Sequence, residues 1–411
     1  MIDFKSFYLD NGLQVIVHED HSVQTAVINL LYDVGSKDEV PELTGFAHLF
    51  EHLMFGGSKH ISSFDDELQK AGGENNAFTS PDVTNYYMTL PPQNLETGFW
   101  LESDRMLSLS FDPKVLEVQR SVVIEEFKQR YLNQPYGDLW LNLRPLAYKK
   151  HPYQWATIGK EISHIEKVTM EDVKSFFFTH YAPDNACLVV AGKVSCEEVK
   201  RLSEKWFGPI PASNRPKRNL AVEPTQKGRR ESTVIGDVPQ DNLTIAFPIP
   251  GKFADTYYSS DLLSDVLGRD KSSRLHTRLV RDEKIFTNIN AYVTGSNDPG
   301  LMLISGKVNQ DIHLKTAEKA VNEVINSVIS GITEEELEKV KNQAESASIF
   351  GDMEVMNRAL RLAMASLSGD ANLVNQEIEK INAVALDDIN RQAGEILDQN
   401  KANVLYYQSQ N

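Results

Sequence analysis

Apolar and polar positions along the chain predict strands and helices that alternate within each region. Residues 12–18 (GLQVIVH) and 25–34 (TAVINLLYDV) are rich in β-branched and apolar side chains and are bounded by turn residues, which is typical of strands. A turn-rich segment follows, and Thr44 is placed to cap a helix that begins directly after it. Residues 93–133 have a largely helical pattern, and 186–191 predict another strand.

The second half of the chain repeats this pattern. Residues 168–173 (VTMEDV) correspond to 384–389 (VALDDI) at an offset of 384 − 168 = 216, and the same offset places 186–190 over 402–406. Units of a solenoid are much shorter than such a repeat, so the repeat indicates a duplicated domain. We therefore predict an α+β fold with two homologous domains of like fold, each a mixed sheet with helices packed on it.

A basic segment with several prolines separates the two halves. It holds Pro216 and Pro224 among lysines and arginines, and we interpret it as a solvated connector more readily than as a binding patch. The predicted organisation is an N-terminal domain at 1–212, a linker at 213–230 and a C-terminal domain at 231–411.

Composition narrows the classes of partner. The 411 residues contain 42 Lys and Arg against 58 Asp and Glu, a formal charge of −16, which argues against nucleic acid or an anionic membrane surface. Two cysteines cannot make a disulfide framework, so a reducing compartment fits. Apolar runs have the length of strands, and the N-terminus lacks the pattern of a signal peptide. We expect no membrane partner and a cytoplasmic location.

The segment Gly45-Phe-Ala-His48-Leu-Phe-Glu51-His52 carries the candidate chemistry. On a helix, His48 and His52 lie one turn apart on the same face, a spacing that lets two imidazole nitrogens bind one Zn²⁺. Glu51 lies close to that face, and the order His-x-x-Glu-His is the inverted zinc-peptidase signature. The alternative is a pair of structural histidines on a buried helix face.

A third ligand is available further along the chain. Glu125 and Glu126 end an apolar run on a predicted helix, and a carboxylate there would complete a site of two His and one Glu with a position left open. His18 and His21, which flank Glu19 and Asp20, could imitate a metal cluster, but a solvated strand end is the better interpretation.

These residues resemble the pitrilysin family of zinc metallopeptidases, and especially its half-length members related to mitochondrial processing peptidase. In that family a ligand Glu follows the His-x-x-Glu-His motif by some seventy residues, and here 126 − 52 = 74. The resemblance implies that His48, His52 and Glu126 bind Zn²⁺, that Glu125 does not, and that Glu51 is the general base.

The resemblance also implies a substrate-binding edge strand. Residues 71–80 (AGGENNAFTS) and the following Tyr87 are similar to the strand beside the metal, where a peptide adds as a further strand. The residues implied to bind substrate there are Asn76, Ala77, Phe78, Thr79 and Tyr87. An ordinary turn into a half-buried strand is the alternative interpretation.

Two departures from the family pattern are visible. Many relatives have a further Glu seven residues before the third ligand, where this chain has Gln119. The offset of 212, which aligns residues 55–59 with 267–271, places Ser260, Leu263 and Ser264 where the metal motif stands in the first half. The C-terminal half is therefore expected to be scaffold and substrate wall.

Active relatives use an Arg and a Tyr of a C-terminal-type domain to hold substrate and stabilise the oxyanion. Arg281 fits the arginine, but the tyrosine position falls at Thr287 or Asn288, and Tyr292 is out of register. The chain thus has the zinc half of an active site and an incomplete electrophile half.

The leading hypothesis is a zinc endopeptidase that acts on peptides or unfolded segments and needs a partner. Full-length relatives close four such domains around the substrate as a clamshell, whereas this chain has two. We expect a heterodimer with a paralogous subunit that lacks the zinc motif, with a homodimer as the other possibility. The alternative function is a non-catalytic assembly subunit of a larger complex.

Overall fold

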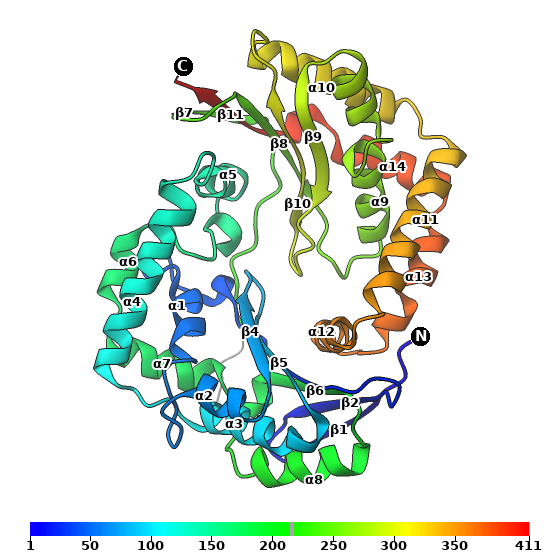
Figure 1. The fold of residues 1–411 in the computed structure, drawn as a ribbon. Helices are drawn as coiled ribbons and strands as arrows, with labels where there is room; N and C mark the ends of the chain where they lie inside the picture. Colours follow the sequence, from blue (N-terminus) through cyan, green and yellow to red (C-terminus); the bar gives the residue numbers. More distant parts are fainter. Residues whose placement is uncertain (214–217, 411) are drawn as a thin grey trace. The chain divides into compact units, whose positions relative to one another are not determined.

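The computed structural model describes residues 1–213 and 218–410, so that residues 214–217 of the predicted linker and Asn411 lie outside the described residues (Figure 1). Contacts divide the chain into two compact units that exchange segments between the sequence halves. Unit 1 comprises Met1–Lys128, Trp155–Ala221 and Ile349–Gln376, and unit 2 comprises Gln129–Gln154, Val222–Ser348 and Glu377–Asn411. The domain limits proposed from the duplication, 1–212 and 231–411, stay a prediction.

Unit 1 is built on a mixed sheet whose described strands lie in the order β1-β2-β6-β3-β5-β4. Strands β2 and β6 are parallel, and the other neighbours are antiparallel. Strand β3 is buried along its whole length, whereas β4 lies at one edge. The strands are β1 (Lys5–Tyr8), β2 (Gln14–Glu19), β3 (Ala26–Tyr32), β4 (Glu74–Thr79), β5 (Thr84–Leu90) and β6 (Ala186–Gly192).

Helices cover this sheet and surround its edge. Helix α12, which comes from the second half of the sequence, packs on β6 and β3, and α1 contacts both α4 and β4. The helices of unit 1 are α1 (Phe46–Leu53), α2 (Phe64–Lys70), α3 (Leu95–Leu107), α4 (Pro113–Phe127), α6 (Ile162–Lys167), α7 (Met170–His180), α8 (Cys196–Trp206) and α12 (Val355–Ser366).

Polar contacts fasten α12 to the N-terminal strands. Arg358 donates to the Asp20 carboxylate at 2.7 Å and lies 3.0 Å from His18 Nε2, while His18 Nδ1 lies 2.6 Å from the Asp3 carbonyl oxygen. His18 is only 6% exposed, so the interpretation of this segment as a solvated strand end is wrong for His18. The sequence could not indicate this burial, because the covering helix comes from a segment some 340 residues away.

Unit 2 repeats the architecture with a sheet in the order β7-β11-β8-β10-β9 over the described strands. Its apolar core lies between this sheet and helices α9, α10 and α14. The strands are β7 (Arg230–Gly236), β8 (Asn242–Ile249), β9 (Phe286–Val293), β10 (Gly300–Val308) and β11 (Asn403–Ser409). The helices are α5 (Leu139–Ala147), α9 (Tyr257–Gly268), α10 (Leu314–Ile329), α14 (Leu386–Ile396) and most of α11 (Glu334–Gly351) and α13 (Leu373–Ala383).

The two sheets confirm the predicted pair of like folds. The order β2-β6-β3-β5-β4 corresponds strand by strand to β7-β11-β8-β10-β9, and in each sheet the first two strands named are parallel. Helices α7 and α14 have the same bounds at the offset of 216. Asp172 and Asp388 occupy the same position in their first turns, and each accepts the N–H of the residue before its helix.

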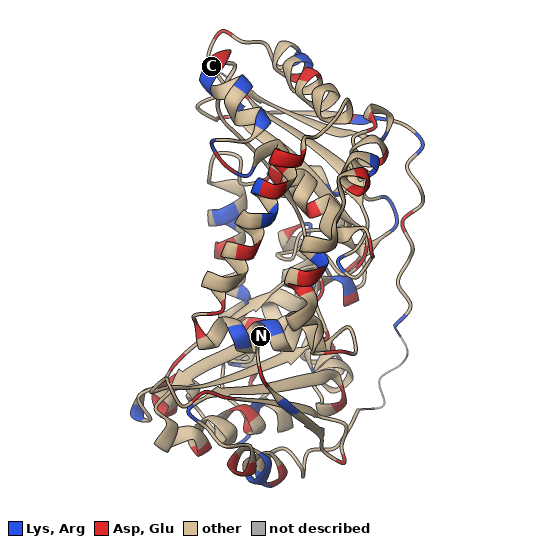
Figure 2. Cartoon of the chain, turned by 90° about the vertical axis from the view of Figure 1, so that its right-hand side faces the viewer, with Lys and Arg blue, Asp and Glu red and all other residues tan. Residues whose placement is uncertain are grey.

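Charged residues of both signs are spread along the helices and loops seen in Figure 2. None of the helices in the described ranges is long and apolar enough to cross a membrane.

Candidate active site

Helix α1 presents the His-x-x-Glu-His motif at the border of the core. Its apolar residues, which include Phe46 and Phe50, are buried against Phe176 of α7 at ring distances of 4.8 and 5.4 Å. The helical period then places His48 and His52 together on the other face, with ring centroids 4.9 Å apart. Packing of the apolar face therefore fixes the direction in which both imidazoles point.

Helix α4 brings Glu126 to the two histidines. Its Oε2 lies 3.7 Å from His48 Nε2 and 3.4 Å from His52 Nε2, and one ligand atom from each residue lies within 4.8 Å of the others. The neighbouring Glu125 points elsewhere, because its carboxylate is 61% exposed and pairs with Lys128 at 2.7 Å. Of the two acids left open by the sequence pattern, only Glu126 joins the histidines.

This donor set fits a zinc ion. Two ligand atoms that are each about 2.0–2.1 Å from a tetrahedral ion lie about 3.3–3.4 Å apart, close to the N···O distances of 3.7 and 3.4 Å here. Two imidazole nitrogens and one carboxylate oxygen are also the donors of known catalytic zinc sites with an open position. The assignment of His48, His52 and Glu126 as ligands stays a prediction that this geometry fits.

Glu51 lies beside the edge strand of the sheet. The hydroxyl of Thr79, the last residue of β4, donates to Glu51 Oε2 at 2.5 Å. Thr79 was expected to contact substrate. In the structure its hydroxyl also donates a hydrogen bond to Glu51, the predicted base.

The other residues expected to bind substrate follow this edge. Asn76 lies opposite Tyr87 of β5, and Phe78 packs partly against the core of unit 1. The backbone N–H of Ala77 donates to the Asn76 side chain at 2.8 Å. Because β4 pairs with β5 alone among the described strands, its outer edge has the form that strand addition requires.

The start of α1 differs from the expectation. The cap position is Gly45, with φ of +85°, and not Thr44, whose hydroxyl lies 2.8 Å from His164 Nδ1 and accepts the N–H of Lys160 at 2.9 Å. A Cβ at residue 45 would meet the Ile158 carbonyl oxygen, so only glycine fits there. The prediction that Thr44 caps this helix is therefore wrong.

Glu39, and not Thr44, accepts the backbone N–H groups at the start of α1. Its carboxylate accepts the N–H of Gly45 at 3.0 Å and that of Ala47 at 2.8 Å. Burial raises the pKa of Glu39 to about 8, although the two N–H donors act in the opposite direction. Sequence reasoning missed this residue, which is one of three acids, Asp38, Glu39 and Glu42, in the turn segment ahead of the motif.

A buried ion pair lies beneath the neighbouring strand. Arg105 donates to both oxygens of Glu102 at 2.8 and 2.6 Å, and its guanidinium lies 4.3 Å from the ring centroid of Tyr86 on β5. Burial raises the pKa of Glu102, while Arg105 acts to lower it. Burial also raises the pKa of Tyr86, to which Glu51 contributes through its charge. Neither Glu102 nor Arg105 was singled out from the sequence.

The candidate electrophile residues lie in unit 2. Arg281 is in a π-helical turn (His276–Asp282), is 63% exposed and pairs with the adjacent Asp282 at 2.8 Å. Thr287 and Asn288 are exposed on β9, where each makes a hydrogen bond with the backbone of Lys307. Tyr292 lies on the same strand and is partly exposed. The part of Arg281 in binding substrate stays a prediction.

The positions on α9 that correspond to the metal motif hold no metal ligands. Ser260, Leu263 and Ser264 are buried, and both serine hydroxyls donate to carbonyl oxygens of their own helix or of the residue before it.

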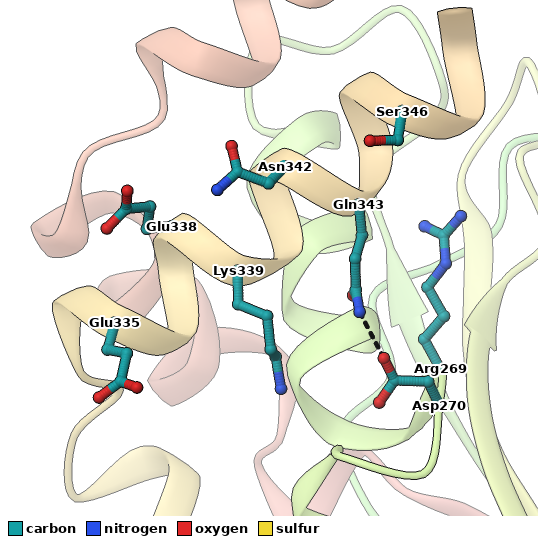
Figure 3. Close-up of a pocket in the computed structure, with 8 residues that line it drawn as sticks. All are labelled: Arg269, Asp270, Glu335, Glu338, Lys339, Asn342, Gln343 and Ser346. Atoms are coloured by element: carbon teal, nitrogen blue, oxygen red, sulfur yellow. Dashed lines mark hydrogen bonds between the residues drawn. The ribbon is translucent and has the colours of Figure 1, made fainter. Parts of the chain in front are cut away.

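A hollow in unit 2 lies beside α11 and the end of α9 (Figure 3). Several of its polar groups are engaged within the protein: Gln343 donates to Asp270, Lys339 to Ser272 at 3.1 Å and Arg269 to Asp265 at 2.5 Å. The hollow shares no residue with the cluster on α1 and α4.

Known proteins are similar to this chain along most of its length. Residues 14–159 match the family described as Insulinase (Peptidase family M16), and residues 167–344 match the Peptidase M16 inactive domain. Zinc protease PqqE of Helicobacter pylori is 30% identical over 374 residues, which cover 86% of this chain and 84% of that protein. The mitochondrial-processing peptidase subunit beta of Lentinula edodes is 24% identical over 408 residues, which cover 95% of this chain and 86% of that protein.

Solved structures share the fold. The crystal structure of a protease from Helicobacter pylori has a TM-score of 0.94 and 27% identity, and the match covers 99% of this chain and 100% of that chain. The periplasmic protease PqqL from Escherichia coli has a TM-score of 0.82 and 19% identity, and 99% of this chain covers 48% of that one. This chain thus spans about half of PqqL. The resemblance drawn from the motif is confirmed, and the chain belongs to the insulinase family, peptidase family M16.

Proposed function

We propose that this protein is a zinc-dependent endopeptidase that cleaves peptides or unfolded segments held as an added strand on β4. The observation that carries the proposal is the convergence of His48, His52 and Glu126 beside a carboxylate, Glu51, that contacts the edge strand. The names of similar proteins, which include zinc proteases, support the same class of reaction.

The residues would divide the chemistry among them. His48, His52 and Glu126 would hold the Zn²⁺, which when bound supplies a Lewis acid that polarises a carbonyl and makes water more acidic. Glu51 would accept the proton of the attacking water and return it to the leaving amine. Thr79 donates to Glu51 Oε2 and would help to orient the carboxylate for this proton transfer.

The substrate would be bound mainly through its backbone. Peptide carbonyl and N–H groups would pair with the outer edge of β4, where a peptide carbonyl oxygen would replace the Asn76 side chain as the acceptor of the Ala77 N–H. Binding through the backbone favours extended or unfolded segments over folded proteins, because a folded protein keeps these groups in its own secondary structure.

The substitution Glu51→Gln tests this proposal. Glutamine keeps the size of the side chain but cannot accept the proton, so we expect turnover to fall by about 10²-fold or more while bound zinc is retained. Cleavage of an unstructured peptide should also stop when a chelator removes the metal. A Glu51→Gln variant that cleaves at the wild-type rate would show that Glu51 is not the base.

We propose further that the active form contains a second subunit. The similarity to a subunit of a processing peptidase and to half of PqqL supports pairing of two such chains. We favour a heterodimer with a paralogue that keeps the Arg and Tyr pair, because Thr287 or Asn288 stands at the tyrosine position here. A non-catalytic assembly subunit is the second candidate, favoured by that same departure and by the family's inactive-domain match.

A further inference from the structure

The loop before α1 contacts two parts of unit 1 that the proposed site uses, the first turn of α1 and the turn that follows β4. This loop, residues 33–39, begins at the end of β3 and ends at Glu39. At its far end the Glu39 carboxylate accepts two N–H groups of the first turn of α1, those of Gly45 and Ala47. Residue 47 directly precedes the proposed ligand His48, so the loop sets the position from which the metal-binding helix begins.

The middle of the same loop fastens the turn that joins β4 to β5. The backbone N–H groups of Ser36 and Lys37 donate to the carbonyl oxygens of Ser80 and Pro81 at 3.1 and 3.0 Å. The Lys37 ammonium also forms a buried ion pair of 2.7 Å with Asp82. Thr79, the donor to Glu51, directly precedes this turn, so one loop holds both the helix and the strand end that meet at Glu51.

A third contact adds to the rigidity of the loop. Arg218 donates to the carboxylates of Asp33 and Asp38 at 3.0 and 2.7 Å and to the Asp33 carbonyl oxygen at 2.7 Å. Asp38 also accepts the N–H of Gly35 at 3.0 Å. Because Arg218 holds Asp33 and Asp38 by charge-assisted hydrogen bonds, displacing the loop that leads to Glu39 requires breaking several contacts.

We infer that Glu39 is a positioning residue for the proposed zinc site, an inference that rests on the proposed function. Its carboxylate fixes the first turn of α1, so that the imidazoles of His48 and His52 face Glu126 before metal arrives. Glu39 lies too early in the chain to be part of the motif, and its carboxylate accepts backbone N–H groups of residues 45 and 47. Its effect therefore passes through the backbone of α1.

The alternative is that Glu39 stabilises the fold without any particular effect on the site. The two cases differ in how metal affinity responds at a given loss of stability. A residue that only stabilises the fold lowers the free energy of unfolding and leaves the zinc dissociation constant of the folded protein unchanged. A positioning residue weakens zinc binding, as partners that orient metal ligands do, typically by about 10–100-fold.

The experiment measures zinc dissociation constants by competition with a chromophoric chelator, together with the free energy of unfolding of the metal-free chain. Glu39→Ala should raise the dissociation constant by about 10–100-fold. Glu39→Gln should raise it less, because the amide keeps one oxygen acceptor and presents an NH₂ to the other N–H. Val189→Ala, in the buried strand β6 of the same unit, is the stability control and should bind zinc as the wild type does.

The outcomes separate this inference from the proposed function. If Glu39→Ala and Glu39→Gln both bind zinc within twofold of the wild type, or if Val189→Ala weakens zinc binding equally, Glu39 is not a positioning residue. If Glu39→Ala does not fold, the comparison of Glu39→Gln with Val189→Ala decides. His48→Ala is measured alongside: retention of zinc by that variant would overturn the proposed site itself, whatever Glu39 does.

Discussion

Two adjacent glutamates at the end of α4 have opposite surroundings. Successive helical residues differ in direction by about 100°, so Glu126 can face the histidines while Glu125 lies in solvent with Lys128. We predict that Glu126→Gln lowers bound zinc to a small fraction of the wild-type content, because a neutral amide is a poor ligand for the cation. Metal content by atomic absorption after gel filtration measures this.

Glu125→Gln is the matched control for this prediction. It makes the same chemical change one residue away, in an exposed ion pair that contributes little to stability, and its zinc content should equal that of the wild type. Full retention of zinc by Glu126→Gln would contradict the ligand assignment. Loss of zinc by Glu125→Gln would indicate that Glu125, and not Glu126, is the ligand.

Glycine 45 is required by the backbone at the start of α1. Its φ of +85° costs other residues about 1–2 kcal/mol, and a Cβ there would also collide with the Ile158 carbonyl oxygen. We predict that Gly45→Ala lowers the free energy of unfolding by more than that amount. Gly394→Ala should raise it by about 0.5–1 kcal/mol, because residue 394 lies inside α14 with open space around it. Urea denaturation of both variants compares them.

At the scale of elements, the outer edge of β4 is the feature that the proposed substrate would use. Ala77→Pro removes the N–H that donates to the Asn76 side chain and that the substrate would use, and proline is tolerated on an edge strand when its missing N–H faces outward. We predict that this substitution lowers kcat/KM for an unstructured peptide by about tenfold, because a tenfold change corresponds to roughly the free energy of one hydrogen bond. Zinc content should be unchanged. An unaltered kcat/KM would mean that the peptide is not held at this N–H.

Much of the fold follows from local patterns that the sequence makes visible. The capping acids Asp172 and Asp388 recur at the offset of 216, and the helices they begin have matching bounds. The predicted strands at 12–18, 25–34 and 186–191 correspond to β2, β3 and β6 with shifts of one or two residues. These signals are local, since caps and runs of β-branched residues act within a few residues.

The sequence predicted the parts of the site whose residues are close together in the chain. It did not predict the parts whose position depends on contacts with distant residues. Helical spacing places His48 and His52 together from the sequence alone. Glu39 was missed because its partners are backbone N–H groups, which leave no trace in residue identity. The prediction that Thr44 caps α1 was wrong because its hydroxyl contacts the His164 side chain and the Lys160 N–H, which are more than a hundred residues away in the sequence.

At the scale of the whole molecule, the duplicated folds exchange pieces. Residues 129–154, from the first half of the sequence, belong to unit 2, and 349–376, from the second half, belong to unit 1. Helix α12 buries Ala359 and Leu362 in the core of unit 1, so the second half of the sequence completes the unit that holds the metal cluster. An isolated N-terminal half would expose this part of its core, which makes the full chain the proper unit for every measurement proposed above.

The last prediction concerns how many chains form the active enzyme. Among its described residues the chain has one group of side chains that could hold a metal ion, on α1 and α4, and Ser260, Leu263 and Ser264 stand at the corresponding positions of the second half. It also has Thr287 or Asn288 where active relatives of the family present a tyrosine. A homodimer would therefore have two metal clusters and would lack the Arg and Tyr pair at both.

A heterodimer with a paralogue that keeps this pair and lacks the metal motif would contain one complete site. We predict that the purified chain binds zinc but cleaves peptides weakly, and that adding such a paralogue raises chelator-sensitive cleavage by about 10²-fold or more, the usual effect of restoring an oxyanion donor. Sedimentation velocity shows whether the two chains associate, and a peptidase assay on the chain alone and on the mixture measures the gain. If the chain alone sediments as a dimer and cleaves robustly, the homodimer is the enzyme. Tyr292, four residues beyond Asn288 on β9, is then the group to replace with phenylalanine, because its hydroxyl is the nearest substitute for the missing one in the sequence.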